Sequence, residues 1–187
     1  MTVPEAPLEE TGLGLVLAGE GWFVLNATEA RWRAREGRGK SLPFEGQLDF
    51  PQVAINLFVL GPGEPIGMYH WEADQEDFFV ISGEALLLVE GEERPLRQWD
   101  FVHCPAGTNH MILGAGAGTC VVLALGGRGR HDGADWGAYT VDDLALRHNA
   151  GVEVETSEPR EAYARFPEVV PTRFDADWLP SDNHGRM

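Results

Sequence analysis

The sequence contains little cysteine, few basic residues and no long hydrophobic run. Its two cysteines, Cys104 and Cys120, are too few for a disulfide-stabilised scaffold and are expected to be reduced thiols. Fourteen Lys and Arg stand against 30 Asp and Glu, so the formal net charge is −16. This charge disfavours nucleic acid or an anionic membrane surface as a partner. No stretch approaches the roughly 18 apolar residues that a membrane span requires.

The N-terminal residues also lack the pattern of a secretory signal. The apolar run from Leu13 to Ala18 is short, and Glu5, Glu9 and Glu10 stand where a signal peptide carries basic residues. We therefore expect a cytoplasmic protein. Its 187 residues, 43% of them hydrophobic, suffice for one domain with a sizeable core and are few for two.

Short strand patterns separated by glycine-containing turns dominate the middle of the chain. The run from Val53 to Leu60 is almost continuously apolar, which is typical of a strand covered on both faces. Glu90-Gly91 lies between two further strand patterns and predicts a hairpin. Turns about every eight to twelve residues favour an all-β barrel or sandwich. Outside this region we expect short helices at residues 28–36, capped by Thr28, and at residues 141–148.

Histidines and carboxylates gather at two places in this β region. His70, Glu72 and Glu76 lie between glycine-containing turns. If residues 70–72 form a strand, His70 and Glu72 project from the same face, with Cα atoms roughly 6.6 Å apart. A short polar turn then returns Glu76 to the same place, and a Pro-Ala-Gly turn delivers His110 to the start of a later strand. Two imidazoles and two carboxylates suit a hard-to-borderline divalent metal.

These two stretches resemble the two motifs of the cupin superfamily. The first family motif is glycine, five residues, His-x-His, three or four residues, Glu, six residues and Gly. His70, Glu76 and Gly83 fit it, whereas Glu72 replaces the second histidine and the leading glycine is displaced to Gly63.

The second family motif is Gly-Asp, a strand, Pro-x-Gly, two residues and His. Asp100, Pro105, Gly107 and His110 fit it. Trp99 replaces its glycine, and Gly114 stands at its trailing asparagine.

The resemblance implies a cupin-type jelly-roll β-barrel with N- and C-terminal extensions. We expect an N-terminal arm and edge strand at residues 1–49, the barrel at 50–125, and a linker and C-terminal extension packed on the barrel at 126–187. The resemblance also implies a homodimer.

As a cupin-like site, His70, Glu72, Glu76 and His110 are the predicted ligands of a divalent transition metal. Two carboxylates favour Mn²⁺ or Fe²⁺, while Zn²⁺ and Ni²⁺ remain open. Glu72, where the chain departs from the family pattern, has two interpretations. Either it is a ligand, or it faces solvent and the remaining three residues form a facial triad.

Four further residues are candidates for the lining of a small-molecule pocket: Asn56, Met68, Phe78 and Cys104. Met68 and Phe78 share the inward register of His70 and Glu76 and would form an apolar wall. Asn56 interrupts an apolar strand, so it either lines the pocket or satisfies nearby backbone groups. Cys104 either lines the pocket or is simply a small buried residue.

Five of the fourteen basic residues lie between Arg31 and Lys40. This cluster is either an anion contact or a solvated loop beside an acidic protein, and the composition favours the loop.

Two classes of function remain. The first is a metal-dependent enzyme acting on a small oxygen-bearing molecule, of oxygenase, isomerase or lyase type. The second is a non-catalytic cupin that binds metal or a small ligand as a sensor or store. The fold alone does not choose between them.

Overall fold

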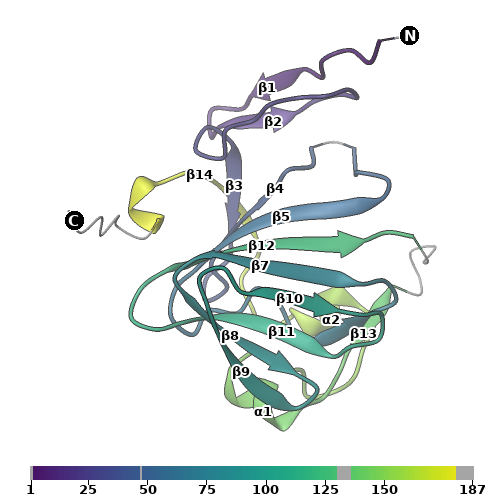
Figure 1. The fold of residues 1–187 in the computed structure, drawn as a ribbon, viewed down its shortest axis with the longest axis vertical. Coiled ribbons are helices and arrows are strands. Elements are labelled where there is room, and N and C mark those ends of the chain that lie inside the picture. The colour runs from purple at the N-terminus through teal and green to yellow at the C-terminus, as the bar shows by residue number, and fades with distance from the viewer. Residues whose placement is uncertain (1, 47, 130–135, 180–187) are drawn as a thin grey trace.

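The computed structural model describes residues 2–46, 48–129 and 136–179 of the chain. In these residues the protein is almost entirely β, with two large antiparallel sheets facing one another (Figure 1). A separate two-stranded sheet, β1 (Leu8–Glu10) and β2 (Leu15–Leu17), lies beyond one end of the pair. The expected all-β jelly-roll barrel is therefore confirmed.

The larger sheet has seven strands in the order β10-β7-β12-β5-β4-β3-β14. Its strands are β3 (Arg31–Ala34), β4 (Lys40–Pro43), β5 (Val53–Leu60), β7 (Glu76–Ser82), β10 (Phe101–Cys104), β12 (Cys120–Gly127) and β14 (Val170–Arg173).

The smaller sheet has five strands in the order β13-β6-β11-β8-β9. They are β6 (His70–Glu72), β8 (Glu84–Val89), β9 (Glu92–Arg97), β11 (His110–Ala115) and β13 (Gly137–Tyr139).

The barrel core lies between the two sheets. Side chains alternate along each strand, so one face of every strand points inward. Phe78 and Val80 of β7 are buried in this core, as are Val122 and Ala124 of β12. Ile112 of β11 closes the core from the smaller sheet.

Left-handed backbone appears where the strands turn. Glu90 and Gly91 have φ of 48° and 76° and join β8 to β9 in a two-residue hairpin. Gly83, between β7 and β8, has φ of 78°, and a Cβ there would lie 2.6 Å from the carbonyl oxygen of Thr119. Only glycine fits this turn without displacing β12.

The helix expected at residues 28–36 is wrong. Arg31–Ala34 is instead strand β3, paired with β4 on one side and with β14 on the other. Trp32 decides the outcome, because it is only 1% exposed and packs against Phe174 and Trp178 from the far end of the chain. This long-range burial overrides the local helix signal.

In the part of the chain that the structure describes, three short helical segments follow the barrel: α1 (Asp143–Arg147), α2 (Pro159–Ala162) and the 3₁₀ turn η1 (Ala176–Trp178). Helix α1 lies within the predicted residues 141–148, and the side chain of Asp142 caps it by accepting a hydrogen bond from the Ala145 amide at 2.8 Å. Part of the expected linker, residues 130–135, lies outside the described residues. None of the helices in the described part of the chain is long and apolar enough to cross a membrane.

Candidate metal centre

Three strands each begin with one residue of the candidate site. His70 opens β6, Glu76 opens β7 and His110 opens β11. Strands β6 and β11 are neighbours, with His110 directly opposite His70, so the two imidazole centroids lie 4.9 Å apart. Glu76 approaches from the facing sheet, which places a carboxylate between the two imidazoles.

Nitrogen and oxygen atoms of these residues converge inside the barrel. Nε2 of His110 lies 2.8 Å from Oε2 of Glu76, and Nε2 of His70 lies 3.7 Å from the same oxygen. One ligand atom from each of the three residues lies within 4.8 Å of the others. The His110 side chain is 2% exposed, and those of His70 and Glu76 are 13% and 16% exposed. The site is therefore largely shielded from water.

Backbone carbonyls fix the tautomer of both histidines. Nδ1 of His70 lies 2.8 Å from the carbonyl oxygen of Met68, and Nδ1 of His110 lies 2.9 Å from that of Thr108. A carbonyl only accepts, so each Nδ1 carries a proton and donates it. In the neutral rings, both Nε2 lone pairs then face the Glu76 carboxylate.

Lone pairs and a carboxylate repel one another unless a cation lies between them. That cation is either a proton or a metal ion, and the donor set of two imidazoles and one carboxylate fits a divalent transition metal. A second hydrogen bond that orients a ligating histidine is also the usual arrangement in metal sites.

The titration of His110 reflects this arrangement. Burial by itself lowers the pKa of His110, but the Cys104 thiol and the Glu76 carboxylate raise it more strongly, to about 10. In the metal-free protein, a proton on His110 therefore pairs with Glu76 at neutral pH.

Glu72 lies at the edge of the centre. Its Oε1 is 3.3 Å from Nε2 of His70, and its side chain is 24% exposed. Glu72 is not part of the group whose ligand atoms all lie within 4.8 Å of one another. The structure thus gathers three of the four predicted ligands closely and leaves Glu72 in contact with one of them.

Two of the four predicted pocket residues lie beside His110. The ring of Phe78 is 5.4 Å from the imidazole, centroid to centroid. Cys104 is 1% exposed, belongs to the barrel core and pairs in register with Glu76.

Asn56 and Met68 lie in different surroundings. Asn56 is on β5, on the same face as the core residues Phe58 and Leu60. Met68 is buried in a cluster with residues that follow the barrel, and its sulfur accepts a hydrogen bond from the Arg38 guanidinium at 2.7 Å.

Sequence patterns did not identify the aromatic residues from beyond the barrel. Trp136 and Tyr139 each lie 5.9 Å from the His70 ring, and Tyr163 lies 5.8 Å from Tyr139. Burial raises the pKa of Tyr139 far above its ordinary value, so its hydroxyl remains protonated at neutral pH. The pairing of β13 with β6 brings Tyr139 opposite His70. No local motif around Tyr139 signals this pairing.

Comparisons with known proteins agree with this architecture. Residues 56–126 match the sequence model of the cupin domain. A putative sugar phosphate isomerase from Acidithiobacillus ferrooxidans ATCC 23270 is 31% identical, with 43% of this chain and 52% of that chain covered and a TM-score of 0.39. The chain thus spans about half the length of that protein.

Two further structures are similar over about half of the chain. KdgF from Halomonas sp. is 20% identical, with 53% of this chain and 88% of that chain covered and a TM-score of 0.45. A cupin superfamily protein from Desulfitobacterium hafniense DCB-2 is 26% identical, with coverages of 50% and 80% and a TM-score of 0.42. No curated protein matches the sequence. With both motifs inside residues 56–126, this part of the chain is a cupin domain.

Proposed function

We propose that this protein holds a divalent transition metal at His70, Glu76 and His110 and acts on a small oxygen-bearing molecule as an oxygenase, isomerase or lyase. The observation that carries the proposal is the pair of Nε2 lone pairs, fixed by the Met68 and Thr108 carbonyls, that face one carboxylate. With both imidazoles neutral this site carries the charge of one carboxylate, and a divalent metal ion is a cation that this donor set fits.

The donor set narrows the choice of metal. Imidazole and carboxylate together favour Mn²⁺ or Fe²⁺, with Zn²⁺ and Ni²⁺ as alternatives by general affinity order. When bound, such a metal supplies a Lewis acid that polarises an oxygen of the substrate.

The chain's own residues have separate tasks in this proposal. The backbone bonds to Nδ1 hold both imidazoles in position, and Phe78 restricts access of water to His110. Glu72 lies close enough to His70 either to add a fourth ligand atom or to hold a proton at Oε1.

Metal analysis tests the proposal directly. The protein is purified without a nickel column and offered Mn²⁺, Fe²⁺, Zn²⁺ and Ni²⁺ separately, and bound metal is measured before and after dialysis. We expect about one equivalent per chain, lost in His110→Ala and kept in His148→Ala, whose imidazole pairs with Glu93 away from the barrel interior. Failure of the wild type to retain any of the four metals would refute the metal site.

Activity assays separate the two classes of function. Oxygen uptake and product analysis on a panel of small hydroxy, keto and sugar acids should reveal metal-dependent turnover. Retained metal without turnover on any panel member would favour the non-catalytic alternative, a sensor or storage protein.

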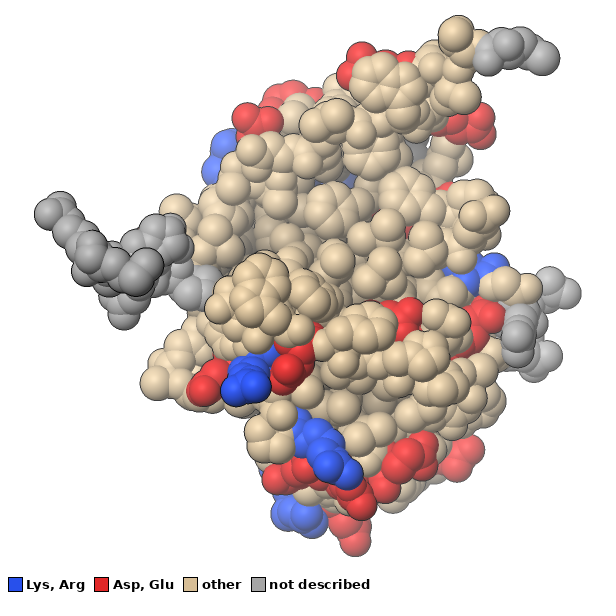
Figure 2. Space-filling view, viewed as in Figure 1, with Lys and Arg blue, Asp and Glu red and all other residues tan. Residues whose placement is uncertain are grey.

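We also propose a homodimer formed through the outer face of the larger sheet. Four apolar residues line up across this face in register: Phe101 of β10, Phe79 of β7, Leu123 of β12 and Leu57 of β5. Phe101 is 62% exposed, and Trp99 beside it is 66% exposed. The face over β5 and β12 shows few charged side chains (Figure 2). An apolar row of this kind commonly marks an interface.

Sedimentation at micromolar concentration checks the dimer. We expect twice the 20.5 kDa chain mass for the wild type and the single-chain mass for Phe101→Glu. A wild type that sediments as a single chain would exclude this interface.

A further inference from the structure

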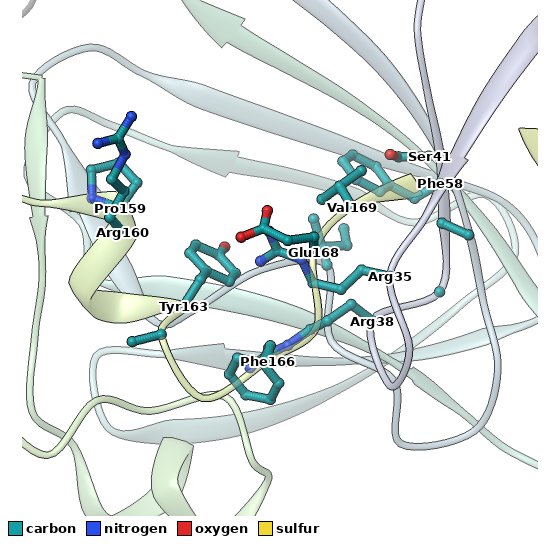
Figure 3. Close-up of a pocket in the computed structure, with 14 residues that line it drawn as sticks. Arg35, Arg38, Ser41, Phe58, Pro159, Arg160, Tyr163, Phe166, Glu168 and Val169 are labelled. Carbon is teal, nitrogen blue, oxygen red and sulfur yellow. The ribbon is translucent and has the colours of Figure 1, made fainter. Parts of the chain in front are cut away.

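A cavity of about 720 Å³ lies at the side of the barrel, between the β3–β4 hairpin and the segment from α2 to β14. Ala34, Ser41 and Phe58 line it from the larger sheet, and Ile66 lines it from the segment that leads into β6. Tyr163 and Phe166 cover it from the C-terminal extension (Figure 3). Neither end of the chain forms the cavity alone.

Three arginines line this cavity although the chain carries a net charge of −16. They are Arg35 and Arg38 from the β3–β4 hairpin and Arg160 from α2. The Arg35 guanidinium lies over the Tyr163 ring at 4.5 Å, and among the described residues it takes part in no hydrogen bond or ion pair. Its Nε is buried without a partner, as is Nε of Arg38.

Arg38 holds the floor of the cavity in place. It is 5% exposed, and its guanidinium donates to the carbonyl oxygens of Gly67 and Asn149 at 2.5 and 2.9 Å. Burial lowers the pKa of Arg38 to about 10, and the charges of Arg165 and Arg35 also lower it. Arg38 therefore remains charged at neutral pH, without a carboxylate partner among the described residues. Buried positive charge of this kind is unfavourable until an anion compensates for it.

The cavity and the metal centre are linked by two tyrosines. The Tyr163 hydroxyl accepts a hydrogen bond from the Met68 amide at 3.1 Å, two residues before His70. Tyr139 lies 5.8 Å from Tyr163 and 5.9 Å from His70, ring centre to ring centre. Phe58 and Ile66 line the cavity and also pack against the barrel core. A molecule seated in the cavity thus lies beside the wall of the metal centre.

We propose that this cavity binds the anionic group, a carboxylate or a phosphate, of the small molecule on which the metal centre acts. Arg35 is the principal contact, because its guanidinium has no acceptor among the described residues, while Arg160 adds charge at the opposite side. Arginine suits this task, since its planar donors match the oxygens of both groups. The assignment of the anion to a substrate rests on the proposed function, whereas anion binding itself does not.

Glu168 provides a counter-charge at the cavity rim. It is exposed, lies between Tyr163 and Arg35 in Figure 3, and forms no ion pair within 4.0 Å in the described structure. Its carboxylate repels an entering anion. Neutralising Glu168 should therefore strengthen binding, whereas neutralising Arg35 should weaken it.

Titration of metal-free protein with inorganic phosphate and, separately, with malonate tests the proposal. Binding is followed by calorimetry and by the NMR signals of the arginine Nε–H groups, because those of Arg35 and Arg38 are buried without a partner among the described residues. We expect binding to the wild type, about tenfold weaker binding to Arg35→Gln, and binding a few-fold tighter to Glu168→Gln. Arg94→Gln is the matched control, because Arg94 is exposed on β9 and pairs with Glu92. The tighter of the two probes identifies the chemical group.

The possible results distinguish a failure of the anion-site proposal from a failure of the proposed metal-dependent function. Absence of binding up to 50 mM of either probe, about equal binding to Arg35→Gln and Arg94→Gln, or weaker binding to Glu168→Gln would each overturn the proposal. Binding that requires added metal and ignores Arg35 would place the anion on the metal instead. Arg35-dependent binding in a protein that retains no metal would uphold the anion site and refute the proposed function.

Discussion

The metal centre and the arginine cavity bury charge of opposite sign in the same small domain. In the candidate metal centre, two Nε2 atoms face the Glu76 carboxylate, and the group is negative unless a proton or a metal ion compensates it. In the cavity, Arg35 and Arg38 lie against aromatic rings, and the excess is positive. Neither arrangement is stable by itself in a medium of low polarity. Both arrangements therefore support the two proposals made above, a site for a cation and a neighbouring site for an anion.

The two regions also differ in how the chain builds them. Every member of the metal centre comes from the first residue of a barrel strand, within residues 70–110. The cavity instead requires residues 34–66 and residues 159–169 together. Barrel geometry thus positions the proposed metal ligands, whereas the terminal extensions determine what lies beside them.

Two matched glutamate variants should show the largest difference between the candidate metal centre and the arginine cavity. Glu76→Gln removes the one carboxylate of the metal group, while Glu168→Gln removes a carboxylate from the cavity rim. We expect Glu76→Gln to weaken metal binding more than about 100-fold, because groups that merely orient ligands already contribute about 10- to 100-fold. Glu168→Gln should leave it unchanged. Chelator competition measures both, and similar losses in the two variants would show that overall charge, rather than ligation, governs affinity.

The pH dependence of stability should report the proton that His110 shares with Glu76 in the metal-free protein. In the metal-free protein His110 has its pKa raised to about 10, so its pairing with Glu76 stabilises the fold fully below about pH 6.5, the usual histidine value. This contribution is lost as the pH rises through about 10. We expect the thermal midpoint of metal-free protein to fall by several degrees across this interval.

Glu76→Gln is the control for this pH effect, since it removes the carboxylate that pairs with His110. Its midpoint should change much less over the same pH interval. A wild-type profile as flat as that of the variant would show that His110 is not protonated at neutral pH.

Arginine variants sharpen the distinction between structural and ligand-binding charge within the cavity. Arg38→Gln should destabilise the fold by about 2 kcal/mol, because it leaves the buried carbonyls of Gly67 and Asn149 without a donor. Arg35→Gln should change stability by less than about 0.5 kcal/mol, because its guanidinium donates to no acceptor in the described structure. Urea unfolding of both variants provides the measurement. A loss in Arg35→Gln as large as that in Arg38→Gln would assign Arg35 a structural role.

The sequence allowed the barrel to be predicted because its signals are local. Alternation along each strand and glycine at turns such as Gly83 and Gly91 depend on neighbours in the chain. His70 and His110 begin the adjacent strands β6 and β11, which lie far apart in the chain, and each histidine stands at its position in one of the two cupin-like motifs. The motif spacing was therefore sufficient to place these two residues in one site.

Outside the barrel, partners lie too far along the chain for local patterns to identify them. The hairpin arginines were interpreted mainly as a solvated loop, because nothing near Arg35 or Arg38 points to Tyr163 and Phe166. The helix predicted over residues 28–36 failed for the same reason, since Trp32 is buried by Phe174.

The smallest expected effect concerns Glu72, which lies at the edge of the candidate metal centre, on the side of Tyr139 and Tyr163. Its Oε1 contacts His70, and its charge contributes to raising the pKa of Tyr139. If Glu72 is a ligand, Glu72→Gln should weaken metal retention by about tenfold, less than Glu76→Gln, because a partly exposed carboxylate at the edge contributes less than the shared one. Glu72→His should retain the site and shift its preference towards Zn²⁺ or Ni²⁺, which imidazole suits.

Chelator titration of Glu72→Gln, Glu72→His and His110→Ala separates the two interpretations of this residue. Unchanged retention in Glu72→Gln, alongside loss in His110→Ala, would leave His70, Glu76 and His110 as a facial triad. In that case we expect Glu72 to act on the substrate, because its Oε1 lies 3.3 Å from Nε2 of His70 at the edge of the centre. Its removal should then lower turnover without releasing metal.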